Sequence, residues 1–157
     1  GLYNEAFIPP GVRLVPGFDR RQGLAYRADD PTFSGVAGDV LLAEVRSDRH
    51  RLVNRTPGSG TRILSDELLD GHKPPGYLHQ VKTHNGVAAA IEQRRADWGM
   101  TLETVAKTAG LGFQFVANER YDFAVPEERW DRPAVVALRR LLEDPTVRAE
   151  LADRGFS

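Results

Sequence analysis

The sequence contains no cysteine and no excess of either charge. Without cysteine, the chain can form no disulfide, hold no zinc through thiolates and use no cysteine as a nucleophile. Its 21 lysines and arginines are balanced by 22 aspartates and glutamates, for a formal net charge of −1. Such a chain lacks the long-range positive field that attracts nucleic acid or an anionic membrane. We therefore expect no direct nucleic-acid contact by this chain.

Long apolar runs are absent as well. No stretch approaches the roughly 20 apolar residues that a membrane-crossing helix needs, and no basic leader followed by an apolar segment opens the chain. We expect no membrane association and a cytoplasmic location, with a periplasmic or extracytoplasmic location as the alternative. His50, His72 and His79 form no pair at a helical interval of four, so we predict no metal site. No motif calls for a cofactor.

The composition that remains is ordinary for a soluble globular protein. Of the 157 residues, 41% are hydrophobic and 27% are charged, which gives room for one domain or for two small lobes. From Arg51 onward, short strands alternate with helices of apolar periodicity. The predicted strands lie at 51–54, 78–82 and 96–100, and the predicted helices at 61–70, from Thr83 to about 95, and from Thr101 to 109. This alternation indicates parallel βαβ units and an α/β fold.

The two ends of the chain are less regular. Strands are predicted at 12–16, 23–26, 113–117 and 121–125, and a helix at about 36–44. Near the C-terminus, Asp131 is expected to cap a helix with Pro133 in its first turn, and Asp144 to precede a last short helix. Val135, Leu138, Leu141 and Leu142 form the apolar stripe of the helix that follows Asp131.

A glycine-rich segment carries the clearest chemical signal. Residues 53–62 run from a strand through Gly58 and Gly60 into a helix. The glycines let a ligand approach the backbone, and the first N–H groups of the helix favour an anion. Further donors of the segment are Asn54, Arg55, Thr56, Ser59, Thr61 and Arg62. The segment is neither a Walker loop nor a Rossmann fingerprint, and the structural alternative is a plain strand-to-helix turn that needs glycine and a threonine cap.

A second polar turn precedes the next helix. Thr83, His84 and Asn85 follow a predicted strand, and either Thr83 or Asn85 is suited to cap the helix. Ligands of doubly wound sheets collect at the carboxyl ends of strands, so the two turns are placed to converge on one ligand. For His84, a capping role is the alternative to ligand contact.

Four segments in this order resemble a known family. They are Arg51–Arg55 leading into Gly58–Arg62, Thr83–Ala90 with Arg95–Gly99, Glu119–Pro126, and Arg21–Leu24. Together they resemble the type II periplasmic-binding-protein-like domain attached to some molybdopterin biosynthesis proteins and helix-turn-helix regulators. They are similar more distantly to LysR-type effector domains and to molybdate- and tungstate-binding transport proteins.

The resemblance implies two lobes. Residues 33–117 would form the second lobe with the ligand-binding turns, and residues 1–32 and 118–157 a partial first lobe with the strands that cross between lobes. The opening βα units of the first lobe have no counterpart in this sequence. The apolar stripe after Asp131 would then lack its sheet. We therefore expect a homodimer, packing of the stripe onto the second lobe, or association with a missing lobe or a fused domain.

We interpret the chain as a non-catalytic domain that binds or senses a small anion, either molybdate, tungstate or a molybdopterin-related anion. The alternatives are a solute-binding component of an oxyanion ABC transporter and an enzyme that uses Ser59. No positioned base accompanies Ser59, and Gly-x-Ser-x-Gly is not met. Tyr121 is expected either to close over the ligand or to pack at a hinge, and Trp98 to lie in the core or in a pocket wall.

Overall fold

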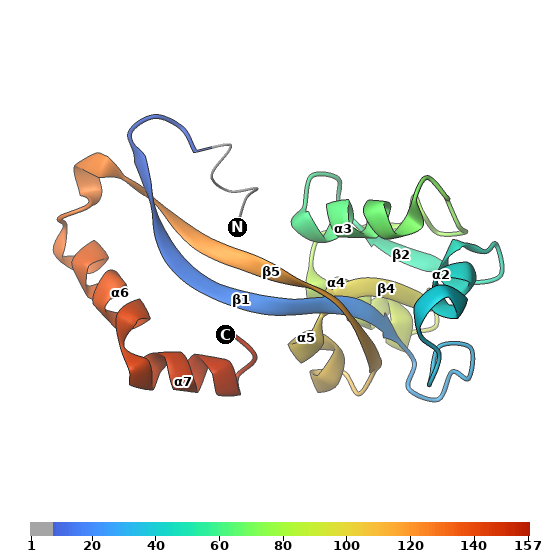
Figure 1. Cartoon of the computed structure of the whole chain (residues 1–157). Coiled ribbons are helices and arrows are strands. Elements are labelled where there is room, and N and C mark those ends of the chain that lie inside the picture. The colour runs from blue at the N-terminus through green and yellow to red at the C-terminus, as the bar shows by residue number, and fades with distance from the viewer. Residues whose placement is uncertain (1–7) are drawn as a thin grey trace. The chain divides into compact units, whose positions relative to one another are not determined.

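The computed structural model describes residues 8–157, which form a mixed α/β structure (Figure 1). Two compact units make up the chain: residues 21–117, and the two ends up to Arg20 and from Asn118. The α/β class predicted from the sequence is confirmed. None of the helices in residues 8–157 has the length and apolar character that crossing a bilayer requires.

One five-stranded sheet of order β3-β2-β4-β1-β5 organises the fold. Strand β2 is parallel to both β3 and β4, whereas β1 is antiparallel to β4. In residues 21–117, the parallel strands therefore end at the same edge of the sheet. The strands are β1 (Val12–Tyr26), β2 (Leu52–Arg55), β3 (Gln80–Val81), β4 (Trp98–Leu102) and β5 (Gly112–Pro126).

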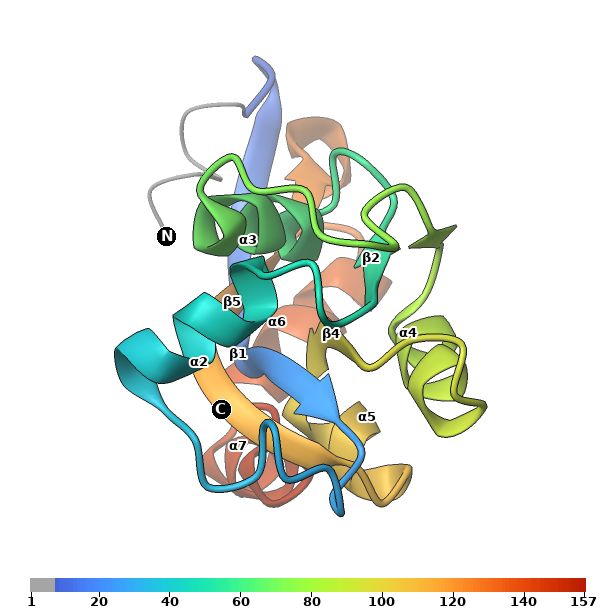
Figure 2. The ribbon, with the colours of Figure 1, turned by 90° about the vertical axis from the view of Figure 1, so that its right-hand side faces the viewer.

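Helices cover both faces of the sheet in residues 21–117 (Figure 2). On one face, α2 (Gly38–Arg46) and α3 (Gly60–Leu69) enclose an apolar cluster that includes Leu24, Leu52 and Trp98. On the other face, α4 (His84–Glu92) and α5 (Glu103–Thr108) pack against Ala25 and Val53. Trp98 is fully buried, so its predicted place in the core is confirmed.

Gly99 brings α4 close to the sheet. A Cβ atom at this position would lie 2.7 Å from a methyl of Val87 in α4 and 2.8 Å from a methyl of Val53 in β2. Separations this short do not occur between real carbon atoms, so a larger residue would push the helix away. The glycine thus allows the first turn of α4 to pack directly against the sheet.

The strands at the two ends of the chain are longer than predicted. The strands expected at 12–16 and 23–26 form one continuous β1, and those at 113–117 and 121–125 form one β5. We had predicted separate strands on the two sides of the charged residues around Arg20. In the structure these charges pair across the two strands, Arg20 with Glu119 and Arg120 with Asp19. Conversely, the strand predicted at 78–82 is reduced to Gln80–Val81.

Two predicted helix starts agree with the structure and two do not. Thr83 accepts a hydrogen bond from Gly86 N and caps α4, and Asp144 accepts one from Thr146 N and caps α7 (Pro145–Asp153). The helix expected after Asp131 begins instead after Arg132, as α6 (Pro133–Glu143), with a short 3-10 turn at Glu127–Arg129 before it. Thr101 is a buried residue of β4, and α5 begins after Leu102.

The apolar stripe of α6 packs within its own unit. Leu142 is buried with Val15 of β1 and Val125 of β5, and Val135 and Leu138 lie against this cluster. Leu141, the next residue of the stripe, keeps 52% of its surface exposed. The stripe therefore finds its partner in β1 and β5, which we had not anticipated, and self-association stays a prediction.

The packing of α6 can be tested by comparing a buried and a half-exposed leucine of the stripe. We expect Leu142→Ala to lower the free energy of unfolding by about 2–3 kcal/mol, the lower part of the range for buried leucines, because the cluster is small. Leu141→Ala should change it by less than about 0.5 kcal/mol, since its side chain is half exposed. Urea denaturation of both variants compares them, and equal losses would show that the stripe is not packed as described.

Candidate functional site

Polar residues gather at the edge where β2, β3 and β4 end. Helix α3 begins after β2, and α4 begins after β3, so both helices direct their first turns toward this edge. The positive ends of two helix dipoles therefore lie at the carboxyl ends of parallel strands, where α/β sheets bind ligands. The Gly58 turn that joins β2 to α3 has a φ of 84°, which favours glycine.

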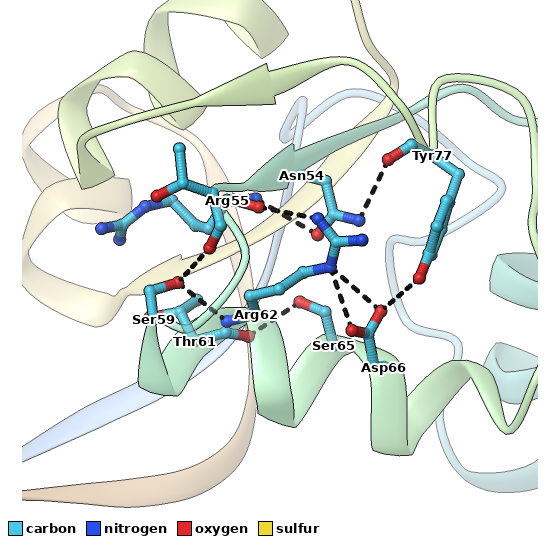
Figure 3. A network of polar contacts seen from close by, with 9 residues as sticks. Asn54, Arg55, Ser59, Thr61, Arg62, Ser65, Asp66 and Tyr77 are labelled. Carbon is cyan, nitrogen blue, oxygen red and sulfur yellow. Dashed lines mark hydrogen bonds and ion pairs between the residues drawn. The ribbon is translucent and has the colours of Figure 1, made fainter.

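Ser59 is the residue that caps α3. Its Oγ accepts a hydrogen bond from Arg62 N at 3.2 Å and donates one to the Thr56 carbonyl at 3.0 Å (Figure 3). The sequence had suggested Thr61 as the cap. Thr61 is instead the second residue of the helix, is buried, and donates its hydroxyl to Gln22 Oε1 at 2.7 Å. Both hydroxyls were expected to donate to a ligand, and both donate within the protein.

Arg62 is also used inside the protein. Its Nε lies 3.1 and 3.0 Å from the two carboxylate oxygens of Asp66, and its Nη1 donates to the Arg55 carbonyl at 3.0 Å (Figure 3). Tyr77 donates to Asp66 at 2.9 Å, and its ring lies 4.7 Å from the guanidinium. Burial acts to lower the pKa of Arg62, but the bonds to Tyr77 and Asp66 outweigh it and raise that pKa. We had taken Arg62 for a ligand contact.

Asn54 likewise serves the fold. It is buried, its Nδ2 donates to the Tyr77 carbonyl at 3.2 Å, and its Oδ1 accepts from Arg55 N at 3.1 Å. Together with Arg62, Asn54 therefore fixes the loop that contains Tyr77 against β2. The expectation that it contacts a ligand finds no support in these contacts.

Several donors of the same segment stay available. Within residues 8–157, no acceptor bonds the backbone N–H of Gly60 or Thr61, and no partner bonds the Thr56 hydroxyl. The same holds for the side chain of Asn85 in the first turn of α4. A Cβ added at Gly58 would meet no atom within 4 Å, so the space above the turn is open.

Arg55 and His84 connect the two polar turns. Arg55 Nη1 donates to His84 Nδ1 at 3.0 Å, and its Nη2 donates to the Lys82 carbonyl at 3.2 Å. Because a guanidinium only donates, His84 accepts at Nδ1 in this contact. Thr101 Oγ1 lies 3.3 Å from the same Nδ1 and donates to the His84 carbonyl. A fixed positive charge therefore lies between the end of β2 and the start of α4.

Sequence reasoning did not place Gln22, Thr101 or the Arg21–Glu103 pair at this edge. Arg21 bonds Glu103 at the start of α5, where Lys107 also holds the carboxylate. The hydrogen bonds from Lys107 and Arg21 outweigh burial and lower the pKa of Glu103. A signal for Gln22 was present, because it is a polar residue two positions before Leu24 in an apolar row.

Tyr121 is not in the unit that carries the two turns. It lies in β5 within the other unit, stacked on Phe18 with ring centroids 5.5 Å apart and packed against Phe123 at 5.6 Å. The residues from Asn54 to Arg62 and from Thr83 to Asn85 are thus together in residues 21–117. Nowhere in residues 8–157 do three or more histidine, aspartate or glutamate side chains gather in a way that could hold a metal ion.

The fold and this polar edge define a ligand-binding domain of the periplasmic-binding-protein class. The chain belongs to the PBP superfamily domain family, whose model matches residues 2–143. The uncharacterised protein YvgK of Bacillus subtilis (strain 168) is 27% identical over 165 residues, which cover 97% of this chain and 50% of that protein. The chain therefore spans about half the length of this relative.

Solved structures of several binding proteins share the fold. A Clostridium perfringens protein described as a phosphate ABC transporter substrate-binding protein, with bound phosphate, matches with a TM-score of 0.72 at 12% identity, over 99% of this chain and 74% of that one. The regulatory domain of Synechocystis PCC6803 CcmR, in complex with 2-PG, matches with a TM-score of 0.64 at 18% identity, over 85% of this chain and 68% of that one. The substrate-binding domain of a protein described as a Clostridium difficile molybdenum ABC transporter matches with a TM-score of 0.60 at 12% identity, over 99% of this chain and 71% of that one.

The assignment of the cap leads to a direct test. Ser59→Ala should lower the free energy of unfolding by about 1 kcal/mol, because α3 loses the acceptor for Arg62 N. Ser59→Asn keeps a capping oxygen and should stay close to the original protein. Thermal or urea unfolding without ligand measures both. A Ser59→Ala protein as stable as the Ser59→Asn protein would contradict a capping role.

Proposed function

We propose that residues 21–117 bind a small oxyanion at the first turn of α3, with molybdate, tungstate or a molybdopterin-related anion as the ligand. The observation that carries the proposal is the pair of backbone N–H groups of Gly60 and Thr61 that no acceptor within residues 8–157 bonds. Orphan N–H groups of a helix start, together with its dipole, form an anion site. The Thr56 hydroxyl adds a further donor.

The charge around this turn supports an anion. Arg55 lies at the end of β2 and is oriented by His84 and the Lys82 carbonyl. The negative charge of Glu103, which follows β4, is balanced by ion pairs with Arg21 and Lys107. The open glycine turn allows an oxygen of the ligand to reach the backbone without a side chain between them. An oxyanion would thus meet donors and a fixed cation.

The comparisons favour the same ligand class. Two of the structures with this fold come from proteins described as phosphate and molybdenum transport components, and the phosphate protein contains its anion. Their identity to this chain is low, so the choice of molybdate or tungstate rests on the sequence resemblance to domains of molybdopterin biosynthesis proteins. Two settings suit this site, a sensor domain and the solute-binding component of an oxyanion transporter.

We propose no catalytic role for the site. The Ser59 hydroxyl donates to the Thr56 carbonyl, so its proton is not directed at a base. The His84 Nδ1 accepts from Arg55 and is therefore not placed to activate Ser59. A nucleophile needs an adjacent base within hydrogen-bond reach. Turnover that Ser59→Ala abolishes would contradict this proposal.

Anion binding should be measurable as stabilisation. Molybdate or tungstate at about 100 times its dissociation constant should add roughly 2.7 kcal/mol to the free energy of unfolding and raise the melting temperature. Sulfate at the same concentration should raise it less. Differential scanning calorimetry with each anion tests this, and the absence of a shift with any of the three would refute the ligand class.

The Thr56 hydroxyl provides a residue-level test. Thr56→Val removes a donor that has no partner within residues 8–157, and a hydrogen bond to a charged group contributes about 1.5–3 kcal/mol. We expect at least tenfold weaker molybdate binding by isothermal titration calorimetry. Thr146→Val, at an exposed position of α7, is the matched control and should bind as the original protein does. Equal affinities in both variants would place the anion away from Thr56.

A further inference from the structure

The buried side-chain amide of Gln22, at this edge, forms a hydrogen bond within residues 8–157 through its oxygen only. Gln22 is 3% exposed and pairs with Leu102 of β4. Side chains two apart in a strand share a face, so Gln22 continues the row of Leu24 and Tyr26, which belong to the apolar cluster under α3. Its Oε1 accepts the Thr61 hydroxyl at 2.7 Å. A polar side chain therefore occupies a position that the row would fill with an apolar one.

The nitrogen of the same amide has no partner. No atom of residues 8–157 accepts a hydrogen bond from Gln22 Nε2, and this nitrogen is not among the fully enclosed unpaired polar atoms. It therefore reaches solvent and keeps both N–H donors. Because Oε1 and Nε2 share one carbon, the nitrogen lies beside Thr61, in the first turn of α3. There the Gly60 and Thr61 N–H groups also lack an acceptor within the described chain.

We propose that Gln22 is a ligand-contacting residue, whose Nε2 donates a hydrogen bond to the anion bound at the first turn of α3. The proposal rests on the anion site proposed above and adds a donor from β1 to those from the β2–α3 turn. Thr61 then acts as a positioning residue. By donating to Oε1, it holds the amide with the nitrogen toward the ligand, while its backbone N–H contributes to the site.

A purely structural role does not account for this arrangement. If the Gln22–Thr61 bond served only the fold, an apolar pair of similar shape would serve as well, because replacing both partners of a buried hydrogen bond is nearly neutral or stabilising. The Nε2 end, which reaches solvent, gives the fold no hydrogen bond within residues 8–157. Structural and binding roles therefore predict the same unliganded stability for the paired replacement, but only the binding role predicts a loss of molybdate affinity.

The experiment compares molybdate affinity and unliganded stability in the same proteins. The double variant Gln22→Leu with Thr61→Val should melt, without anion, at or above the temperature of the original protein. Its molybdate affinity by isothermal titration calorimetry should fall at least tenfold, equivalent to about 1.4 kcal/mol. Gln22→Glu keeps the acceptor for Thr61 and replaces the donor by a negative charge, so it should weaken binding more, by about a hundredfold.

Gln93→Glu is the matched control, because it makes the same change at the exposed C-terminal end of α4. It should leave the molybdate affinity within twofold. A second readout needs no variant at all. In amide NMR spectra of the isotope-labelled original protein, the side-chain NH₂ signals of Gln22 should shift on saturation with molybdate, whereas those of Gln93 should not.

The outcomes separate this inference from the anion site itself. If the original protein binds molybdate and both Gln22 variants bind it equally well, the contact with Gln22 is wrong and the anion site stands. Gln22 signals that do not move at saturation lead to the same conclusion, even if the variants fail to fold. If the original protein binds neither molybdate, tungstate nor sulfate, both the site and the contact with Gln22 are refuted.

Discussion

The geometry of the polar edge where β2, β3 and β4 end depends on Arg62, which bonds both Asp66 and the Arg55 carbonyl. Arg62 is buried, and it reaches Asp66 on its own helix, the Arg55 carbonyl at the end of β2 and the ring of Tyr77. Removing Asp66 would leave the buried Arg62 guanidinium without its charged partner, although Asp66 itself is 43% exposed. The pair orients the Arg62 guanidinium, and the bond from that guanidinium to the Arg55 carbonyl ties the start of α3 to the end of β2.

This dependence divides the polar residues of the glycine-rich segment into two groups. Asn54, Ser59 and Arg62 use their side chains to shape the turn. Their role in the proposed anion site is therefore the conformation they impose, in which the backbone and the neighbouring Thr56 hydroxyl present donors. A backbone that is held this firmly can bind an anion without first being ordered, which reduces the loss of conformational entropy on binding.

The sequence was sufficient for features that depend on local pattern. The α/β class, the caps Thr83 and Asp144 and the buried Trp98 all follow from periodicity and from capping preferences. It was insufficient where partners lie far apart in the chain. The Arg20–Glu119 pair makes a continuous strand of a charged segment, and the Thr61–Gln22 bond joins residues 39 positions apart. Neither contact has a local signal, so the break in β1 and the cap at Thr61 were inferred wrongly.

The opposite edge of the same sheet shows what a fully paired polar cluster looks like. Before β2 and β4 begin, Asp97 accepts from Arg51 N at 2.8 Å and from the Arg27 guanidinium at 2.7 Å. Burial alone would raise the pKa of Asp97, but these bonds outweigh it and lower that pKa. At the carboxyl edge, by contrast, donors of Gly60, Thr61 and Gln22 lack acceptors within the described residues. The groups at the two edges differ in kind, because the open N–H groups of Gly60 and Thr61 belong to the first turn of α3, where a helix has no acceptors of its own. The proposed anionic ligand is the partner that would bond them.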